Sequence, residues 1–286
     1  MAKKLYIVLV VFLSTVFAQA EDLRVSIDEL SKNLENYKVI DVRNNDDFKE
    51  GHIKGALNFP IVLTYENKSE NGRIVEPPKM QALLREKGLD TQDNIVIHDN
   101  GTFFDAARLF WSLEVYGFKN VKLLNGGFDE WDLKDHPTST KAITPKKSNY
   151  IAAIDNKRLA TKFATQIASK SPTQTLIDAR AAKAYKGEVS SAQRFGHIPS
   201  AKHIPATHNI GKSNGVAKLK SISELEKTYA GVDKSKKVVL YCAIGRISSA
   251  NYFAMRELGY NVANYDASWK EWGNDLSLPI NNPAKQ

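Results

Sequence analysis

The chain contains one succession of sequence elements twice, and this duplication constrains its fold more than any other feature. The matching stretches are, in order, residues 39–43 with 176–180, residues 51–56 with 196–201, and residues 94–99 with 237–242. A tail that leads from a glycine to a tryptophan closes each copy, at Trp131 and at Trp272. The spacing of about 140 residues is too long for a solenoid repeat and is typical of duplicated domains.

Each copy alternates short β-branched runs with helical stretches, which is typical of a parallel sheet. We therefore predict an α/β fold with two domains, each a mainly parallel sheet with helices on both faces. The expected segments are a leader at 1–20, a first domain at 21–135, a linker at 136–150 and a second domain at 151–286. The linker is assigned from its Thr, Ser, Lys and Pro content and its lack of a hydrophobic period.

The first 20 residues have the pattern of a secretory signal peptide. Lys3 and Lys4 precede a short apolar run at residues 5–17, and Ala18-Gln19-Ala20 matches a cleavage site. The apolar run is too short to span a bilayer comfortably. We therefore expect a periplasmic or secreted protein without stable membrane insertion; the alternative is an uncleaved N-terminal anchor.

Composition excludes several classes of function. The formal net charge of +8 comes from basic residues that are scattered along the chain. This charge favours small anions in a cleft, although a well-solvated surface is the simpler explanation. No arginine-rich stretch is interleaved with aromatic residues, so nucleic-acid binding is not expected. The spacing of His197, His203 and His208 fits no common metal-ligand motif, and we expect neither a metal nor another cofactor.

Cys242 is the only cysteine of the chain, and its sequence context suits chemistry. It follows the apolar run 238–241, which predicts a buried strand, and a helical pattern begins at Ser248 and Ser249, which are expected to cap the helix. A thiol between a strand end and a helix N-terminus meets unpaired N–H groups and the positive end of the helix dipole, and both favour the thiolate. The expected backbone donors are Ala243, Ile244, Gly245, Ile247 and Ser248.

Together these segments resemble the rhodanese family of sulfurtransferases. The matching motifs are two Asp-x-Arg strand ends, two Gly-His-Ile segments, a Tyr-Cys-x-x-Gly loop and two Gly…Trp tails. The resemblance covers nearly all of residues 22–275 and is to the tandem enzymes in which only the second domain keeps its cysteine. Asp99 stands in the place of Cys242 in the first domain. Because a carboxylate cannot carry a sulfane sulfur, the resemblance implies that the first domain is catalytically silent.

The resemblance implies a sulfurtransferase reaction at Cys242. The thiolate would take the outer sulfur of a small anionic donor, become a persulfide, and pass the sulfur to a thiol, cyanide-type or protein acceptor. Arg246 is expected to hold the anionic group of the donor, with a solvent-facing or ion-paired side chain as the alternative. By analogy with the family, Arg180 and Lys183 are further candidates for substrate binding, and an ion pair is the alternative role of Arg180.

Two features leave the choice of donor open. The second arginine that vertebrate-type enzymes place four positions after the first is replaced by Ala184. The loop also lacks the Cys-Arg-Lys-Gly pattern of thiosulfate enzymes and the Cys-Gly-x-Gly-Val pattern of mercaptopyruvate enzymes. We expect thiosulfate as the donor. The alternatives are 3-mercaptopyruvate as the donor, and a non-catalytic sulfur carrier or binding module as the function.

Two other roles of Cys242 are less well supported. Phosphatases that share this fold need an arginine six positions after the cysteine, where this chain has Ser248. A buried and inert thiol is a common state of a lone cysteine. The strand–loop–helix context and the duplicated framework argue against that role here.

Overall fold

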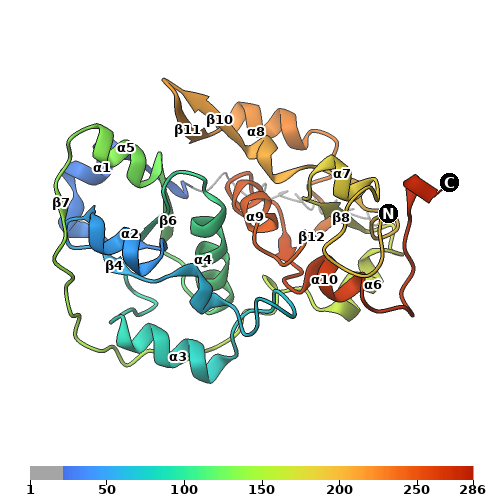
Figure 1. The fold of residues 1–286 in the computed structure, drawn as a ribbon, viewed down its shortest axis with the longest axis horizontal. Coiled ribbons are helices and arrows are strands. Elements are labelled where there is room, and N and C mark those ends of the chain that lie inside the picture. The colour runs from blue at the N-terminus through green and yellow to red at the C-terminus, as the bar shows by residue number, and fades with distance from the viewer. Residues whose placement is uncertain (1–21, 286) are drawn as a thin grey trace, which may run out of the picture.

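The computed structural model describes residues 22–285, which form two α/β domains side by side (Figure 1). The first domain is blue to green and the second is yellow to red. Each domain has a parallel sheet with helices, as predicted. The predicted leader, residues 1–20, lies outside the described residues.

The first domain is built on a five-stranded sheet in the order β1-β6-β5-β2-β4, and each of its strand pairs is parallel. The central strand β5 is buried along its whole length, as an apolar run between two helical layers must be. The strands are β1 (Arg24–Ser26), β2 (Lys38–Asp41), β4 (Leu57–Asn58), β5 (Ile95–His98) and β6 (Val121–Asn125). The helices are α1 (Ile27–Lys32), η1 (Leu34–Asn36), α2 (Asn45–Glu50), η2 (Ile61–Thr64), α3 (Pro77–Glu86), α4 (Phe104–Val115) and α5 (Gly127–Leu133).

The second domain repeats this plan with a parallel sheet in the order β13-β12-β8-β9 and adds an antiparallel hairpin, β10–β11. Its strands are β8 (Gln174–Asp178), β9 (Lys202–His203), β10 (Ile210–Ser213), β11 (Val216–Leu219), β12 (Lys237–Tyr241) and β13 (Val262–Asn264). Its helices are α6 (Lys162–Ala168), α7 (Ala182–Tyr185), η3 (Ala206–Asn209), α8 (Ile222–Tyr229), α9 (Ser248–Glu257), α10 (Ser268–Trp272) and η4 (Pro283–Lys285).

The segment predicted to be a linker, residues 136–150, is packed on the first domain. Its strand β7 (Thr138–Ser139) pairs with β3 (His52–Ile53). Further along, Tyr150 is buried, and its hydroxyl donates to the carbonyl of Tyr116 at 2.7 Å. A polar segment without hydrophobic periodicity can thus still be ordered, because its backbone groups and a single aromatic side chain bind an existing surface.

Helices α4 and α9 pack against each other, and one continuous apolar core extends through this contact from domain to domain. Phe110 meets Phe253 edge to face, with ring centroids 5.0 Å apart. Beside these rings, the buried carboxylate of Glu114 accepts hydrogen bonds from the Tyr252 hydroxyl and the Arg256 guanidinium. Because separating a buried charge from its partners is costly, this contact fixes one domain relative to the other.

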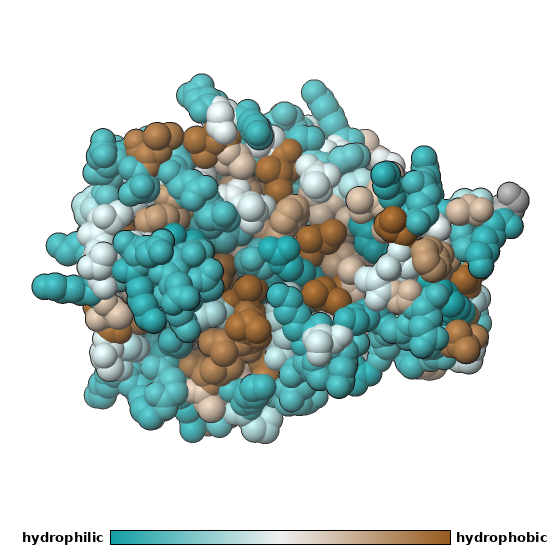
Figure 2. All heavy atoms as spheres, viewed as in Figure 1, coloured by the Kyte–Doolittle hydropathy of each residue, from teal (hydrophilic) through white to brown (hydrophobic). Residues whose placement is uncertain are grey.

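Figure 2 shows apolar side chains gathered over the middle of one face, at the seam between the two halves, with hydrophilic side chains toward its edges. Among residues 22–285 there is no helix that is long and apolar enough to cross a bilayer.

The second domain extends an arm onto the first, the hairpin β10–β11. The N–H of Leu219 donates to Asn125 Oδ1 at 2.9 Å, where β6 ends. Lys218 donates to the carbonyl of Asn125 at 3.1 Å and forms an ion pair with Glu130 of α5. The hairpin therefore covers the first domain at the carboxyl edge of its sheet.

The first domain extends a reciprocal arm, residues 66–74, to α10 of the second (Figure 1). The N–H of Ile74 donates to Asp266 Oδ2 at 2.5 Å, and Arg73 forms an ion pair with Glu271. A Cβ atom on Gly72 would lie 2.0 Å from the carbonyl oxygen of Ile244, in the loop that follows Cys242. Only a glycine therefore lets this arm approach the loop so closely.

We predict that Gly72→Ala lowers the free energy of unfolding by about 1–3 kcal/mol, because the added methyl group overlaps a backbone atom. Gly231→Ala is the matched control, since a Cβ there meets no atom within 4 Å, and its effect should stay within about 0.5 kcal/mol. Urea denaturation of both variants measures the difference. Equal stabilities would show that the arm does not press on the loop.

Candidate active site

Cys242 directly follows β12, which lies between β8 and β13, so the thiol stands at the carboxyl edge of the sheet. Its side chain is 1% exposed. The loop that it opens ends at α9, which begins at Ser248, as the sequence predicts. The carboxyl edge of an open α/β sheet is where ligands of this architecture bind. The thiol is thus held in a fixed, buried place at this edge of the sheet.

The hydroxyl of Ser248 is the nearest polar partner of the thiol, with Oγ 3.4 Å from Cys242 Sγ. The same Oγ lies 2.7 Å from Asn264 Oδ1, while the amide nitrogen of Asn264 donates to the carbonyl of Gly245. A hydroxyl has one proton, so Ser248 donates either to Asn264 or to the sulfur. It can therefore accept from a neutral thiol and, after rotation, donate to a thiolate. Ser248 does not cap α9, because the N-cap position belongs to Ile247.

The loop is folded around the hydroxyl of Ser268, which accepts from the N–H groups of Cys242 at 3.1 Å and Gly245 at 3.0 Å. The prediction that the Gly245 N–H faces the sulfur is therefore wrong, since Ser268 uses this donor. Gly245 has φ of +70°, as a tight turn requires. Four of the predicted donors form no hydrogen bond to any described residue and stay available to an anion: the N–H groups of Ala243, Ile244, Ile247 and Ser248.

The corresponding loop of the first domain shows what such a loop binds. Asp99 follows β5, and its carboxylate accepts from the N–H groups of Gly101 at 2.8 Å, Phe103 at 3.1 Å and Ala106 at 3.4 Å. The Thr102 hydroxyl adds a contact at 3.2 Å. The loop and the start of α4 thus form an anion cradle, which the chain's own carboxylate fills.

Arg246 is ion-paired to the other domain. Its Nε lies 2.5 Å from Asp105 Oδ1 and its Nη2 lies 2.8 Å from Asp105 Oδ2, in a two-point contact. The arginine side chain remains 34% exposed. The geometry therefore places a partly accessible cation in the cysteine loop, held by a carboxylate of α4.

A second residue of α4, the fully buried Arg108, also reaches this loop. Its Nη1 donates to the carbonyl of Gly245 at 3.3 Å, and its Nη2 donates to the carbonyl of Gly72 at 2.9 Å. Asp266 lies close by, and burial raises its pKa against the opposing charge of Arg108. Arg108, a buried charge of the first domain, thus supports the Cys242 loop of the second.

Arg180 has the contacts of a structural residue. It is 3% exposed, and its guanidinium binds the Asp178 carboxylate and the carbonyl of Gly196 at 2.8 Å. In the first domain, Arg43 makes the same contacts with Asp41 and with the carbonyl of Gly51 at 2.7 Å. In each domain these contacts join the Asp-x-Arg motif to the Gly-His-Ile motif. Because the same arrangement occurs in the domain without a cysteine, it gives no evidence that Arg180 binds the sulfur donor.

Lys183 lies on the surface, and the histidines contact an aromatic ring and the backbone. Lys183 is exposed on the short helix α7. His197 and His203 both stack on the ring of Tyr185, and His197 Nδ1 lies 2.7 Å from the carbonyl of that residue. His52 Nδ1 likewise lies 2.7 Å from the carbonyl of Phe48, so the imidazole of each Gly-His-Ile segment bonds nearby backbone. Within the described chain, no three His, Cys, Asp or Glu side chains are grouped to hold a metal ion.

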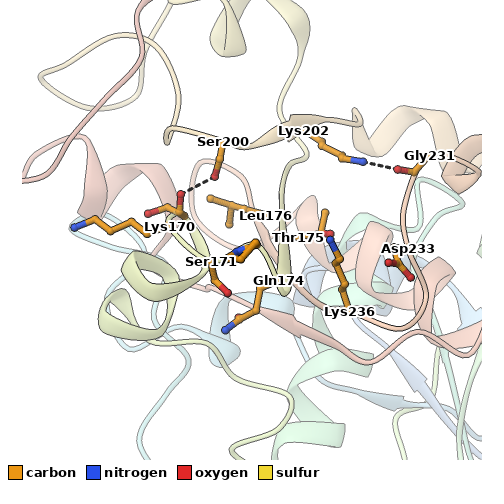
Figure 3. A pocket seen from close by; sticks show the side chains of 12 residues that line it. Lys170, Ser171, Gln174, Thr175, Leu176, Ser200, Lys202, Gly231, Asp233 and Lys236 are labelled. Atoms are coloured by element: carbon orange, nitrogen blue, oxygen red, sulfur yellow. Dashed lines mark hydrogen bonds between the residues drawn. The ribbon is translucent and has the colours of Figure 1, made fainter.

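Two hollows of the described surface lie outside this site. One of about 400 Å³ is at the amino ends of β8 and β12, the edge opposite Cys242, and three lysines line it (Figure 3). The other, of about 680 Å³, lies between the Asp99 loop and the hairpin β10–β11. Phe104 lines this second cavity and has Arg246 5.9 Å above its ring. The second cavity therefore borders the cysteine loop, whereas the first does not.

Sequence reasoning missed several residues of the site. Asn264 ends β13, the neighbour of β12, and Ser268 follows it, so the rule that parallel strands end at one edge could have identified them. Asp105, Arg108 and Gly72 come from the first domain and carry no local signal, because their role arises only when the domains meet.

Comparison with known proteins agrees with this geometry. The family model described as "Rhodanese-like domain" matches residues 26–134 and 159–275. A Mycobacterium tuberculosis protein named "Putative thiosulfate sulfurtransferase" is 31% identical over 274 residues, which cover 91% of this chain and 97% of that protein. A Haloferax volcanii protein of the same name is 29% identical over 282 residues, covering 91% of this chain and 96% of that protein.

Solved structures give the same result. SseA from Escherichia coli, presented as a 3-mercaptopyruvate sulfotransferase, superposes with a TM-score of 0.77 at 27% identity, covering 86% of this chain and 98% of SseA. A structure of EanB with ergothioneine superposes with a TM-score of 0.82 at 20% identity, covering 93% of this chain and 71% of EanB, which is a likeness of fold alone. Two matched domains, the lone cysteine at a strand end and relatives of equal length lead to one conclusion: the chain belongs to the rhodanese family, as a sulfurtransferase with tandem rhodanese-like domains.

Proposed function

We propose that this sulfurtransferase uses thiosulfate as its donor and carries the transferred sulfur as a persulfide on Cys242. The observation that supports this most strongly is the position of the thiol, at the end of β12 under a loop whose free N–H groups face no described partner. The Ser248 hydroxyl at 3.4 Å from Sγ supports a negatively charged sulfur in the same place.

The chemistry needs no cofactor. The Cys242 thiolate attacks the outer sulfur of thiosulfate, a new S–S bond forms, and the old S–S bond breaks with its electron pair leaving on sulfite. The enzyme then holds a persulfide anion, and a thiol or cyanide acceptor removes the outer sulfur and restores the thiolate. Charge is conserved in the first step, because the thiolate monoanion and the thiosulfate dianion give the persulfide monoanion and the sulfite dianion. Such a two-step transfer predicts ping-pong kinetics.

The silent domain supports the persulfide assignment. An aspartate oxygen and the outer sulfur of a cysteine persulfide both lie two bonds beyond Cβ and both carry negative charge. Asp99 therefore resembles a persulfide held in its cradle, with three N–H groups of its own loop and helix bound to it. This likeness favours a Cys242 loop that stabilises the sulfur-loaded enzyme more than the free thiol.

The alternative donor is 3-mercaptopyruvate, which is favoured by the likeness to SseA at 27% identity. Thiosulfate is favoured by the printed names of the curated relatives. A carrier that passes sulfur to a protein uses the same persulfide and differs only in its acceptor.

Incubation of the protein with thiosulfate, and separately with 3-mercaptopyruvate, tests the donor. We expect a mass increase of about 32 Da, one sulfur atom, with thiosulfate, and its loss in Cys242→Ser, because only the thiolate can accept a sulfur. Intact-protein mass spectrometry under non-reducing conditions measures it. An adduct from 3-mercaptopyruvate alone would select the other donor, and an adduct that persists in Cys242→Ser would contradict the site.

Kinetics of two variants test the role of Arg246. We expect Arg246→Ala to raise KM for thiosulfate several-fold, because the loop loses its cation. Asp105→Asn should lower KM, since the same cation is then free for the donor. If both changes instead raise KM to the same extent, the ion pair only fastens the loop to the first domain, and Arg246 has no direct role in binding.

We also propose export of the chain, on the pattern of residues 1–20, which lie outside the described residues. Expression of the full chain with a C-terminal tag in a bacterial host should yield a secreted or periplasmic protein that begins near Glu21. N-terminal sequencing of the fractionated product measures this. An intact N-terminus in the membrane fraction would support the uncleaved anchor, and one in the cytosol would contradict export.

A further inference from the structure

Tyr65, at the base of the first arm, is a residue of the silent domain whose contacts lead to the site. It follows η2 and forms an isolated antiparallel bridge with Ile74. Its ring lies against the guanidinium of Arg108, with Cζ 4.4 Å from the ring centroid. Arg108 in turn donates to the carbonyl of Gly245 in the Cys242 loop. Tyr65 is thus held firmly beside the catalytic loop, although it belongs to the other domain.

The hydroxyl of Tyr65 is buried and has no hydrogen-bond partner among the described residues, whereas the residue as a whole is 4% exposed. The other fully buried tyrosine hydroxyls of residues 22–285 are all bonded. Tyr150, for example, donates to the carbonyl of Tyr116, and Tyr229 donates to Asn209 Oδ1. Because a buried hydroxyl is rarely left without a partner, the exception points to a partner that arrives with a ligand.

The ring of Tyr65 lies against a charged group that reaches the Cys242 loop. Burial raises the pKa of Tyr65, and its electrostatic neighbours are Arg108, Asp105, Cys242 and Arg246. The hydroxyl therefore keeps its proton at neutral pH and acts as a donor. Packing of the ring against Arg108 would need only the aromatic face, so a phenylalanine would serve a purely structural role equally well.

An anionic sulfur donor needs a neutral hydrogen-bond donor such as this hydroxyl, because Arg246, the cation of the Cys242 loop, is already paired with Asp105. The Arg246 guanidinium makes a two-point contact with Asp105, which neutralises much of its charge. A dianion that enters beside this pair must be bound by neutral N–H and O–H donors as well. The unbonded N–H groups of the Cys242 loop supply some of these, and the Tyr65 hydroxyl is a free side-chain donor in the same region.

We infer that Tyr65 binds the sulfonate end of the sulfur donor, with its hydroxyl donating a hydrogen bond to a sulfonate oxygen while Cys242 attacks the outer sulfur. This inference rests on the proposed function, because it takes thiosulfate as the sulfur donor. No proton moves in this step: the S–S bond of the donor breaks, its electron pair leaves on sulfite, and Tyr65 donates to an oxygen of that leaving group. The silent domain thereby contributes a substrate-binding residue to the active site.

Thiosulfate binding to Cys242→Ser, which cannot react, separates binding from turnover. We expect isothermal titration calorimetry to show Kd at least about tenfold higher in Cys242→Ser with Tyr65→Phe, because a hydrogen bond to a charged group is lost. Tyr150→Phe in the same background is the matched control and should leave Kd unchanged. Thermal unfolding should rank the two variants the other way round. Tyr150→Phe removes a hydroxyl that is hydrogen-bonded and should lower Tm, whereas Tyr65→Phe removes one that is not and should leave Tm unchanged.

Each outcome decides between the two proposals. Equal Kd values with and without the Tyr65 hydroxyl would overturn this inference. Thiosulfate that fails to bind Cys242→Ser would overturn both the inference and the choice of donor. Binding that depends on Tyr65, together with a wild-type enzyme that takes no sulfur from thiosulfate, would overturn the proposed donor alone and leave Tyr65 as an anion-binding residue.

Discussion

The contact between α4 and α9 is the interaction on which the rest of the structure depends. It joins the two apolar cores and encloses the Glu114 carboxylate, whose partners Tyr252 and Arg256 belong to the other domain. Once α4 is fixed in this way, its N-terminal half projects Asp105 and Arg108 to the cysteine loop. A helix is rigid over this length, so one buried contact at its end determines the geometry of the site at its beginning.

Duplication gave each domain the same parts, and comparison of the two copies separates structure from chemistry within one chain. The Asp-Arg-Gly contact is present in both domains and is therefore structural. In the first domain Asp99 fills an anion cradle of three N–H groups. In the second, Ser268 accepts from the N–H groups of Cys242 and Gly245, and four other N–H groups of the loop bond no described residue. The first domain also supports the Cys242 loop, since its arm and its helix α4 both contact that loop.

The predictions from sequence succeeded where the signal was local. The apolar run before Cys242 became β12, and the helix after it begins at Ser248. They failed where a local group found a distant partner. Gly245 was expected to face the sulfur, but Ser268 takes its N–H from 23 positions further along the chain. For Arg246 the ion pair was one of the two expected alternatives, and only the identity of its partner, Asp105 of the other domain, was beyond the sequence.

The sequence alone determined the two α/β domains, the single cysteine at a strand end and the aspartate that stands in its place in the first domain. These follow from periodicity and from the chemistry of one side chain, which do not depend on how the domains meet. Only the tertiary structure decided which groups surround Cys242. Tyr65, Gly72, Asp105 and Arg108 lie more than a hundred positions away in sequence. No local pattern marks these residues, because burial between two domains is a property of the folded interface and not of any segment by itself.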